Sequence, residues 1–243
     1  MATPTVSSWH SPRVDCAVTL ARWGHFGAPV MLFPTAGGDA REVERMGLIG
    51  ALEPLIAAGR IKVYSCDSVA GRALAAGEGS VAHRCWLLNG FQDHIAHEVV
   101  PAIRDDCRDG AIEVIAGGAS IGAFNALAVT CRYPWLFRAA ICMSGTYDLE
   151  SLLGFRGTGD YFYSSPLAFL PGLEGDLLAA LRSRVIRLAC GEGRWESPAE
   201  AWRVAHLLGR KGIPNRVDIW GQQWDHDWPT WHAMLPGYLG EVF

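Results

Sequence analysis

The chain has little of what marks several common protein classes. Its formal net charge is -4 and its sequence pI is about 6.0, so it lacks the excess of basic residues that nucleic acids and anionic membranes attract. It has no uninterrupted apolar run long enough to span a bilayer. Its 7 cysteines are scattered, without a CxxC pair or a close Cys/His cluster. We therefore expect no nucleic-acid partner, no membrane partner and no metal.

The beginning of the chain also lacks a targeting pattern. The segment MATPTVSSWHSPRVDC has no basic stretch followed by an apolar core, which a secretory signal would show. An odd number of scattered cysteines fits reduced thiols better than a disulfide framework. Together these features predict a cytoplasmic protein.

Hydrophobic segments alternate between strand-like and helix-like character. The chain has 243 residues, 50% of them hydrophobic, which is enough to bury a substantial core, and one domain over residues 1–243 is expected. The strand-like runs are Val14–Trp23, Ala28–Ala36, Arg60–Ser68, Ile112–Gly118, Leu136–Gly145, Val185–Gly193 and Arg216–Gly221. The helix-like runs are Arg41–Gly59, Phe91–Cys107, Ser120–Tyr133 and Ser197–Gly212, and a C-terminal helix should follow.

This alternation predicts an α/β fold with a mainly parallel central sheet and helices on both faces. No helix separates Val14–Trp23 from Ala28–Ala36, so we expect an antiparallel hairpin at the N-terminal side of the sheet. Residues 148–176 are rich in Gly, Pro and aromatic residues and poorly periodic. Because this segment is too long for a plain connection, we expect it to cap a site.

One serine lies in a glycine turn between a predicted strand and a predicted helix. In IEVIAGGASIGAFNALAV, Ser120 lies between Gly118 and Gly122. The order strand, Gly-x-Ser-x-Gly, helix is that of the nucleophile elbow of α/β-hydrolases. The sharp turn there leaves room only for small neighbours, and the start of the helix favours a developing negative charge. We predict Ser120 as the nucleophile and the backbone N–H of Ile121 as an oxyanion donor.

A serine hydroxyl needs a base, and in this fold the acid and then the histidine follow the serine in the chain. Three histidines follow Ser120: His206, His226 and His232. His206 falls inside a predicted helix and His232 at the start of the last one. His226 comes directly after the last strand, in a loop rich in aromatic residues, so we predict it as the general base. The residues that could wall the site are Trp224, Trp228 and Trp231.

The acid that orients the base should follow the strand before the helix that precedes His226. The segment VIRLACGEGRWESP offers Glu192 and Glu196 there, and spacing alone does not choose between them. Asp148 is a third candidate, because it also follows the end of a predicted strand.

A second oxyanion donor should come from an early loop between a strand and a helix. The loop PTAGGDA, Pro34–Ala40, has this place, and its glycines let the backbone approach a ligand closely. We expect the donor to be Thr35 or Ala36, with Gly37 as the weaker candidate.

Several motifs together resemble those of one esterase family of the α/β-hydrolases. The family includes esterase D (S-formylglutathione hydrolase), feruloyl esterases and the mycobacterial mycolyltransferases. The motifs that carry the resemblance are LFPTAGGDA, GASIGAFNAL, RYPWLFRAAICMSGTYDL, GEGRWE and HDWPTW. The last is similar to the His-x-Trp-x-x-Trp pattern around the family's catalytic histidine.

The resemblance also implies roles for individual residues. In the mycolyltransferases the acid is a glutamate a few residues beyond a Gly-x-Gly, which corresponds to Glu196; Glu192 falls inside the Gly-x-Gly and is the weaker match. The oxyanion residue corresponds to Ala36, in a loop that departs from the usual HG-type sequence.

The resemblance implies acyl transfer from an ester or thioester through an acyl-serine, without a metal or organic cofactor. We expect a serine carboxylesterase that acts on a small-molecule ester, and aromatic residues near His226 and in 148–176 favour an apolar acyl or aryl pocket. One alternative is an acyltransferase that passes the acyl group to an alcohol or thiol. Another is a catalytically silent hydrolase-fold binding protein, although candidates for all three triad members are present.

Overall fold

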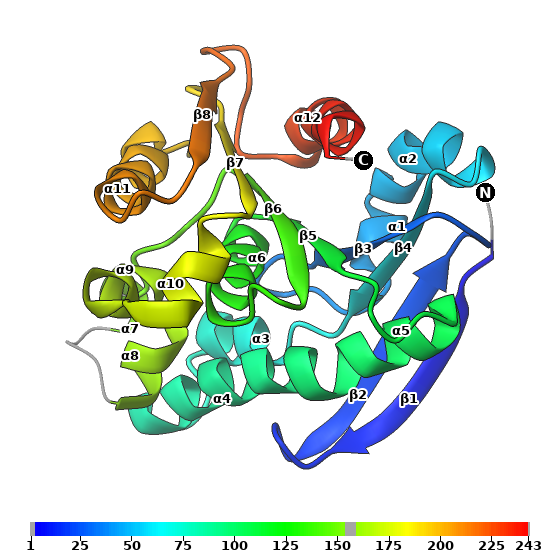
Figure 1. The fold of residues 1–243 in the computed structure, drawn as a ribbon, viewed down its shortest axis with the longest axis horizontal. Coiled ribbons are helices and arrows are strands. Elements are labelled where there is room, and N and C mark those ends of the chain that lie inside the picture. The colour runs from blue at the N-terminus through cyan, green and yellow to red at the C-terminus, as the bar shows by residue number, and fades with distance from the viewer. Residues whose placement is uncertain (1–2, 154–158, 243) are drawn as a thin grey trace.

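Eight strands form one sheet through the middle of the computed structural model, which describes residues 3–153 and 159–242 (Figure 1). The strands are β1 Thr5–Ser11, β2 Cys16–Trp23, β3 Ala28–Phe33, β4 Ile61–Cys66, β5 Val114–Ala119, β6 Phe137–Met143, β7 Val185–Cys190 and β8 Asn215–Ile219. Their order across the sheet is β1-β2-β4-β3-β5-β6-β7-β8. The pairs β1/β2 and β2/β4 are antiparallel and the others are parallel. The predicted mainly parallel α/β sheet is thus confirmed.

An antiparallel hairpin begins the sheet, but its strands differ from those expected. It joins β1 to β2, with Thr5 opposite Arg22 and Ser11 opposite Cys16. The strand β3, which we expected in the hairpin, pairs in parallel with β4 and β5. The sequence of β1, TVSSWHS, is mostly polar and mostly exposed. An edge strand of this kind has no apolar run, so it gives no hydrophobic signal in the sequence.

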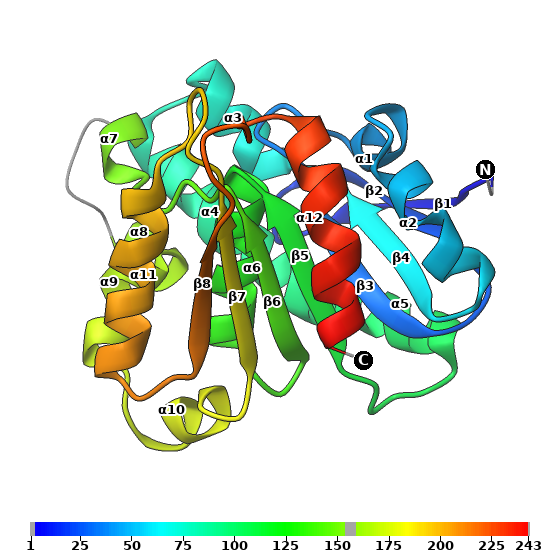
Figure 2. The ribbon, with the colours of Figure 1, turned by 90° about the horizontal axis from the view of Figure 1, so that it is seen from above.

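Helices cover both faces of the sheet, and in Figure 2 α12 lies in front of the sheet while α6 lies behind it. The helices of the described residues are α1 Glu42–Arg45, α2 Leu48–Ala57, α3 Val69–Ala76, α4 Val81–His94, α5 Val100–Cys107, α6 Ile121–Arg132, α7 Glu150–Leu153, α8 Gly159–Ser164, α9 Pro166–Phe169, α10 Gly175–Leu181, α11 Pro198–Arg210 and α12 Trp228–Glu241. The apolar sides of α1, α2 and α12 form one core, and those of α3 to α6, α10 and α11 form the other. The central position of α6 explains its small residues, because Ile121 to Cys131 are all buried.

Two predicted helices are interrupted. The run Arg41–Gly59 divides into α1 and α2 at Gly47, whose φ of 84° lies in the left-handed region that glycine adopts easily. The run Phe91–Cys107 instead belongs to a longer helical segment that starts at Val81 and contains a π-helical turn, Ile95–Val99. This turn ends just before Pro101, which has no N–H to donate to the preceding turn, so the change of hydrogen-bond pattern coincides with the proline.

The segment 148–176 is helical in its described part. It holds α7, α8, α9 and the start of α10, while residues 154–158 lie outside the described residues. The Gln92 amide on α4 donates a hydrogen bond of 2.8 Å to the Ser164 carbonyl, and Asn89 donates one of 3.1 Å to Asp160. Tyr161 is buried. These contacts fix α8 on α4; the cap role of the segment and the one-domain organisation stay predictions.

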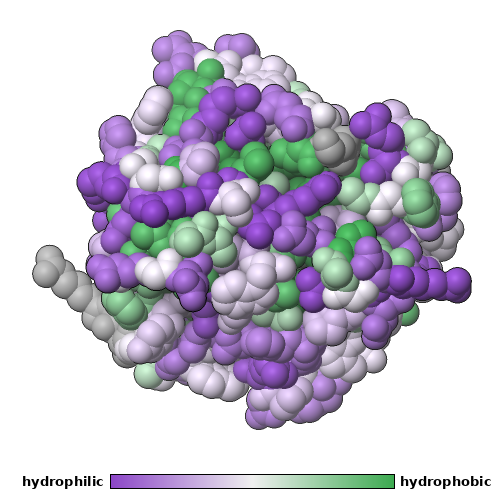
Figure 3. All heavy atoms as spheres, in the orientation of Figure 1, coloured by the Kyte–Doolittle hydropathy of each residue, from purple (hydrophilic) through white to green (hydrophobic). Residues whose placement is uncertain are grey.

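Hydrophilic residues cover most of the face drawn in Figure 3, and hydrophobic residues show as separate patches among them. Of the helices in the described residues, none combines the length and the apolar character needed to cross a membrane.

Candidate active site

The turn at Ser120 has the strained geometry expected of a nucleophile elbow. Its φ is 57° and its ψ is -122°, a region that residues with a side chain rarely adopt. A Cβ on Gly118 would lie 2.5 Å from the backbone of Gly122, and a Cβ on Gly122 would overlap the Phe33 carbonyl oxygen. Only glycine fits at both positions. The turn therefore places Ser120 at the carboxyl edge of the sheet, directly before the first residue of α6.

Glu196 lies buried beside His226 at the same edge. Its Oε2 is 3.7 Å from Nδ1 of His226, and its side chain is 0% exposed against 22% for the histidine. The Ser144 hydroxyl donates to Oε1 at 2.5 Å, and the Cys190 thiol donates to Oε2 at 3.2 Å. The structure thus brings together the predicted base and one of the predicted acids.

This environment keeps Glu196 ionised. Burial raises the pKa of its carboxyl, but the neighbouring His226 and the hydrogen bonds from Ser144 and Cys190 outweigh burial, so the pKa lies below its ordinary value. A carboxylate that is charged at neutral pH can hold the Nδ1 proton of His226 and stabilise the imidazolium.

Ser144 has a role that sequence reasoning missed. It follows β6 with a φ of 47°, and its Oγ both donates to Glu196 and accepts a hydrogen bond of 3.0 Å from Nε1 of Trp231. The Trp231 ring contacts the His226 ring edge to face, with centroids 5.3 Å apart. The one feature of the sequence that could have indicated this role is the position of Ser144 directly after a buried strand, at the same sheet edge as Ser120. Ser144 and Trp231 hold the acid and the base in place from two elements.

The loop that carries the acid lies close against the loop that carries the base. A Cβ on Gly191 would overlap the Trp224 carbonyl oxygen, while the Gly193 N–H donates to that oxygen at 3.0 Å. The His226 N–H donates to the Arg194 carbonyl at 3.0 Å. The Gly-x-Gly of the sequence is therefore required by the close approach of the two backbones.

The other acid candidates lie elsewhere. Glu192 is exposed, and the ion pair of His226 is with Glu196. Asp148 forms an ion pair of 2.7 Å with Arg203 on α11. The geometry therefore favours Glu196 over the two other carboxylates that the sequence left open.

The other histidines that follow Ser120 have different partners. His206 is exposed on α11 and packs beside the Trp202 ring, with centroids 5.9 Å apart. Nε2 of His232 is 2.8 Å from the Met46 carbonyl, between α1 and α2. Neither contacts Glu196 among the interactions of the described residues.

The loop Pro34–Ala40 is held by a glutamate that sequence reasoning also missed. Glu42 accepts hydrogen bonds from the Thr35 N–H at 2.8 Å and from its hydroxyl at 2.7 Å, which engages the Thr35 N–H. Within the part of the chain that the structure describes, the N–H groups of Ala36 and Ile121 have no acceptor. Of the three oxyanion candidates in this loop, Ala36 is thus better placed than Thr35, while the Gly37 N–H likewise has no acceptor within the described residues.

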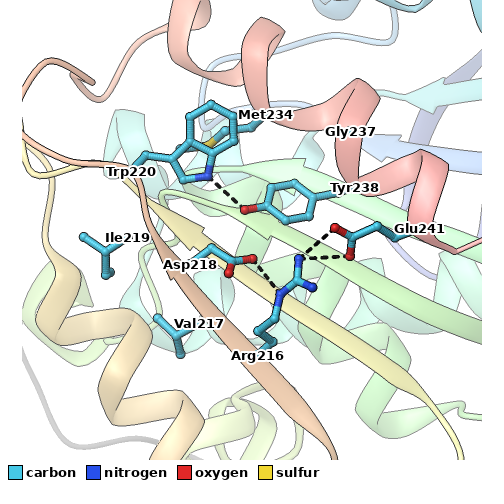
Figure 4. Close-up of a pocket in the computed structure, with 9 residues that line it drawn as sticks. All are labelled: Arg216, Val217, Asp218, Ile219, Trp220, Met234, Gly237, Tyr238 and Glu241. Atoms are coloured by element: carbon cyan, nitrogen blue, oxygen red, sulfur yellow. Dashed lines mark hydrogen bonds and ion pairs between the residues drawn. The ribbon is translucent and has the colours of Figure 1, made fainter.

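A pocket of about 530 Å³ between β8 and α12 lies apart from these residues (Figure 4). Its Arg216 forms ion pairs with Asp218 at 2.8 Å and with Glu241 at 2.9 Å. The Trp220 ring N–H donates to the Tyr238 hydroxyl at 2.9 Å. Because these polar groups already satisfy one another, the pocket lacks the unpaired groups of a reaction site.

The sheet order, the N-terminal hairpin and the strand-turn-helix at Ser120 define the α/β-hydrolase fold. The chain is similar to the solved structure of a ferulic acid esterase, with a TM-score of 0.75, 15% identity and 100% of both chains covered. It is also similar to an S-formylglutathione hydrolase from Agrobacterium tumefaciens, with a TM-score of 0.71, 12% identity, and 99% and 95% of the two chains covered. A third is the fluorophosphonate-binding serine hydrolase F of Staphylococcus aureus, with a TM-score of 0.69, 12% identity, and 99% and 98% covered. These likenesses show a shared fold.

The family described as "Putative esterase" matches residues 57–240, and the chain belongs to this family. Membership supports hydrolase activity on a small-molecule ester. No curated protein sequence matches the chain.

Proposed function

We propose that the protein is a serine carboxylesterase that hydrolyses a small carboxylic ester or thioester through an acyl group on Ser120. The observation that carries the proposal is the buried Glu196 carboxylate facing His226, at the same sheet edge as the strained turn of Ser120. The esterase family and its serine-hydrolase relatives in structure support the same chemistry.

In the acylation step, Nε2 of His226 takes the proton of the Ser120 hydroxyl while Oγ attacks the ester carbonyl carbon. The carbonyl electron pair moves to the oxygen, which the N–H groups of Ile121 and Ala36 stabilise. The tetrahedral intermediate then collapses, the bond to the alcohol or thiol breaks, and the imidazolium gives its proton to this leaving group. Glu196 stabilises the imidazolium throughout.

In the deacylation step, a water molecule replaces the alcohol. His226 takes one proton from the water, the hydroxide attacks the acyl-serine carbon, and the bond to Oγ breaks. The acid leaves, and Ser120 regains its proton from His226. The step requires no metal or organic cofactor. We place the reaction in the cytoplasm on the sequence argument alone, which is the odd number of scattered cysteines.

Hydrolysis of a p-nitrophenyl ester series, from acetate to long acyl chains, tests the proposal. We expect Ser120→Ala to lower kcat by about 10³-fold or more, and Glu196→Gln by about 10²-fold or more. Two matched controls should retain the parent rate: Ser8→Ala on the exposed strand β1 and Glu192→Gln in the acid loop. The chain-length optimum reports the size of the acyl pocket.

Full activity of Ser120→Ala would overturn the proposal. Loss through Glu192→Gln alone would move the acid to Glu192. If an activated fluorophosphonate labels Ser120 but every ester is left intact, added alcohol and thiol acceptors test the acyltransferase alternative. If Ser120 is not labelled either, the protein is a hydrolase-fold binding protein.

A further inference from the structure

A tight turn after β3 carries the N–H group of Ala36 at the same sheet edge as Ser120. The Gly38 N–H donates to the Thr35 carbonyl at 3.1 Å, so Ala36 and Gly37 are the two central residues of the turn. A single turn of this kind can offer an N–H group to a developing oxyanion only if the surrounding structure fixes its position.

The start of the turn is packed against two helices. A Cβ on Gly122 of α6 would overlap the Phe33 carbonyl oxygen and would lie 2.8 Å from the Pro34 carbonyl oxygen. A Cβ on Gly71 of α3 would lie 3.0 Å from the Ala36 carbonyl oxygen. The backbone that leads into the turn therefore contacts the first turn of α6, which supplies the other proposed oxyanion donor.

The end of the loop is fixed by the segment that follows β4. Asp67 accepts hydrogen bonds from the Ala40 N–H at 3.1 Å and from the Thr19 N–H of β2 at 2.9 Å. The Ser68 N–H donates to the Gly38 carbonyl at 3.1 Å. These contacts hold the end of the loop, and the first residue of the turn is held separately.

The carboxylate of Glu42 holds that first residue, Thr35, with both of its oxygens. Oε2 accepts a hydrogen bond of 2.8 Å from the Thr35 N–H, and Oε1 accepts one of 2.7 Å from the Thr35 hydroxyl. A Cβ on Gly38 would overlap the same carboxylate. Glu42 is therefore in contact with both ends of the turn, and its two hydrogen bonds fix the orientation of Thr35 as well as its position.

The orientation of Thr35 determines the direction of the Ala36 N–H. The peptide group that joins the two residues is planar and trans, so its N–H points to the side opposite to its carbonyl. The Thr35 carbonyl points into the turn, toward the Gly38 N–H. The Ala36 N–H therefore points out of the turn, in a direction that changes if Thr35 rotates.

We propose that Glu42 is a positioning residue for the oxyanion hole, acting through Thr35 on the N–H of Ala36. The inference rests on the proposed esterase function and adds to it the group that aligns one of the two donors. A carboxylate near a developing oxyanion repels it, so the charge of Glu42 does not favour the reaction. The hydrogen bonds of Glu42 favour it, because a small misplacement of a donor costs more rate than a partly screened charge.

Steady-state hydrolysis of p-nitrophenyl acetate by the full chain, normalised to the sites titrated with a fluorophosphonate, tests the proposal. We expect Glu42→Ala to lower kcat about tenfold or more and to leave KM within about twofold, because acylation and deacylation both use the oxyanion hole. In Glu42→Gln the amide oxygen accepts from the Thr35 N–H and the amide nitrogen donates to the hydroxyl oxygen. Its kcat should therefore stay within about threefold of the parent value.

Glu44→Ala is the matched control on the same helix. Glu44 accepts hydrogen bonds from Trp23 at 3.3 Å and from Arg41 at 2.8 Å, and none from the turn. Its removal should lower the Tm as much as Glu42→Ala does and leave kcat unchanged.

Inhibition by trifluoroacetophenone gives a measurement that a purely structural role would not change. The Ser120 oxygen adds to the ketone carbon, His226 takes the hydroxyl proton, and the ketone oxygen becomes the oxyanion. We expect the inhibition constant to rise in Glu42→Ala by about the factor by which kcat falls. If Glu42→Ala does not fold, Thr35→Val removes the hydroxyl contact alone, and it should change both quantities about threefold or more.

The inference is overturned if Glu42→Ala, or Thr35→Val in its place, keeps the parent kcat and inhibition constant. It is also overturned if Glu44→Ala loses as much kcat, or if Glu42→Gln is as slow as Glu42→Ala. When the parent is active and Ser120→Ala is inactive, these outcomes overturn this inference alone. A parent that hydrolyses no ester overturns the proposed function, and this inference with it.

Discussion

At the scale of single residues, backbone strain gathers around the proposed triad. Five described residues other than glycine have a positive φ: Asp15, Arg108, Ser120, Ser144 and Trp195. Ser120 is the proposed nucleophile, Ser144 donates to the acid, and Trp195 directly precedes that acid. Such conformations cost free energy and persist where the surrounding structure requires them. Their clustering here indicates that placing the triad residues lowers the local stability of the fold.

Trp195 gives a direct measure of this strain. Glu196 donates its N–H to the Gly193 carbonyl at 3.3 Å, so Trp195 is the third residue of a tight turn, with a φ of 63°, where glycine is preferred. We expect Trp195→Gly to be more stable than Trp195→Ala by about 1 kcal/mol in urea unfolding. Both variants lose the indole, so their difference isolates the backbone.

The same pair of substitutions at Trp202, in the helix α11, is the control. In the helix, Trp202→Ala should have a free energy of unfolding about 1 kcal/mol higher than Trp202→Gly. Equal stability of the two Trp195 variants would show that the turn holds no strain.

At the scale of elements, the site depends on loops from different strands that approach closely. The acid loop after β7 and the histidine loop after β8 share backbone hydrogen bonds, and a Cβ on Gly191 would overlap the Trp224 carbonyl oxygen. We expect Gly191→Ala to push the two loops apart and lower kcat about tenfold or more, because a misplacement of about 1 Å can cost about 10²-fold in rate. Steady-state kinetics with a p-nitrophenyl ester measures the loss.

Gly209→Ala is the matched control, because a Cβ on Gly209 would meet nothing within 4 Å. It lies in α11, where alanine is favoured over glycine, so it should raise the free energy of unfolding by up to about 1 kcal/mol and leave kcat unchanged. A Gly191→Ala enzyme with the parent kcat would contradict the role given to this contact.

The N-terminal hairpin is attached to the helices through Glu98 in the π-helical turn. Glu98 accepts hydrogen bonds from Trp9 at 2.8 Å, Ser11 at 3.0 Å and Arg13 at 3.0 Å. Burial raises the pKa of its carboxyl, but the hydrogen bonds from these three donors lower it by more. The net result is a pKa of about 2, below the ordinary value of 4.5. Because the folded pKa is depressed, the stabilisation is complete above the unfolded pKa and is lost as the pH falls from about 4.5 to about 2.

We expect Glu98→Gln to lower the free energy of unfolding by about 3 kcal/mol at pH 7. The difference from the parent should shrink as the pH falls through this window. Urea unfolding at a series of pH values measures it. A difference that stays constant down to pH of about 2 would contradict the assignment.

The elements that could be predicted from the sequence are those with a strong apolar pattern. The buried strand β5 and the small-residue helix α6 were located by their sequence, and with them the turn at Ser120. The polar strand β1 was missed, because it lies at the edge and buries little. The roles of Ser144 and Glu42 were missed for another reason. Ser144 contacts Glu196 on a distant loop, and Glu42 contacts Thr35 because the loop before α1 folds back on the helix. Spacing encodes neither contact.

At the scale of the whole molecule, the parallel sheet separates two kinds of chemistry. The carboxyl ends of β5, β6 and β7 gather Ser120, Ser144 and Glu196 at one edge. At the other edge, a cavity of about 950 Å³ at the amino ends of the strands is lined by basic residues that include Arg60, Lys62 and Arg138. Loops at the carboxyl ends of parallel strands are where this kind of fold places ligands, so the position of the triad candidates follows from topology. The basic cavity does not, and only the structure shows it.

Mass spectrometry of the native chain after treatment with a fluorophosphonate tests the central claim most directly. The account predicts one phosphonyl group per chain, on the peptide that contains Ser120, and loss of labelling when the chain is unfolded first. Labelling should also fall in Glu196→Gln, because the base is then no longer held. A label on another serine, or none on the folded chain, would contradict the assignment of Ser120 as the nucleophile.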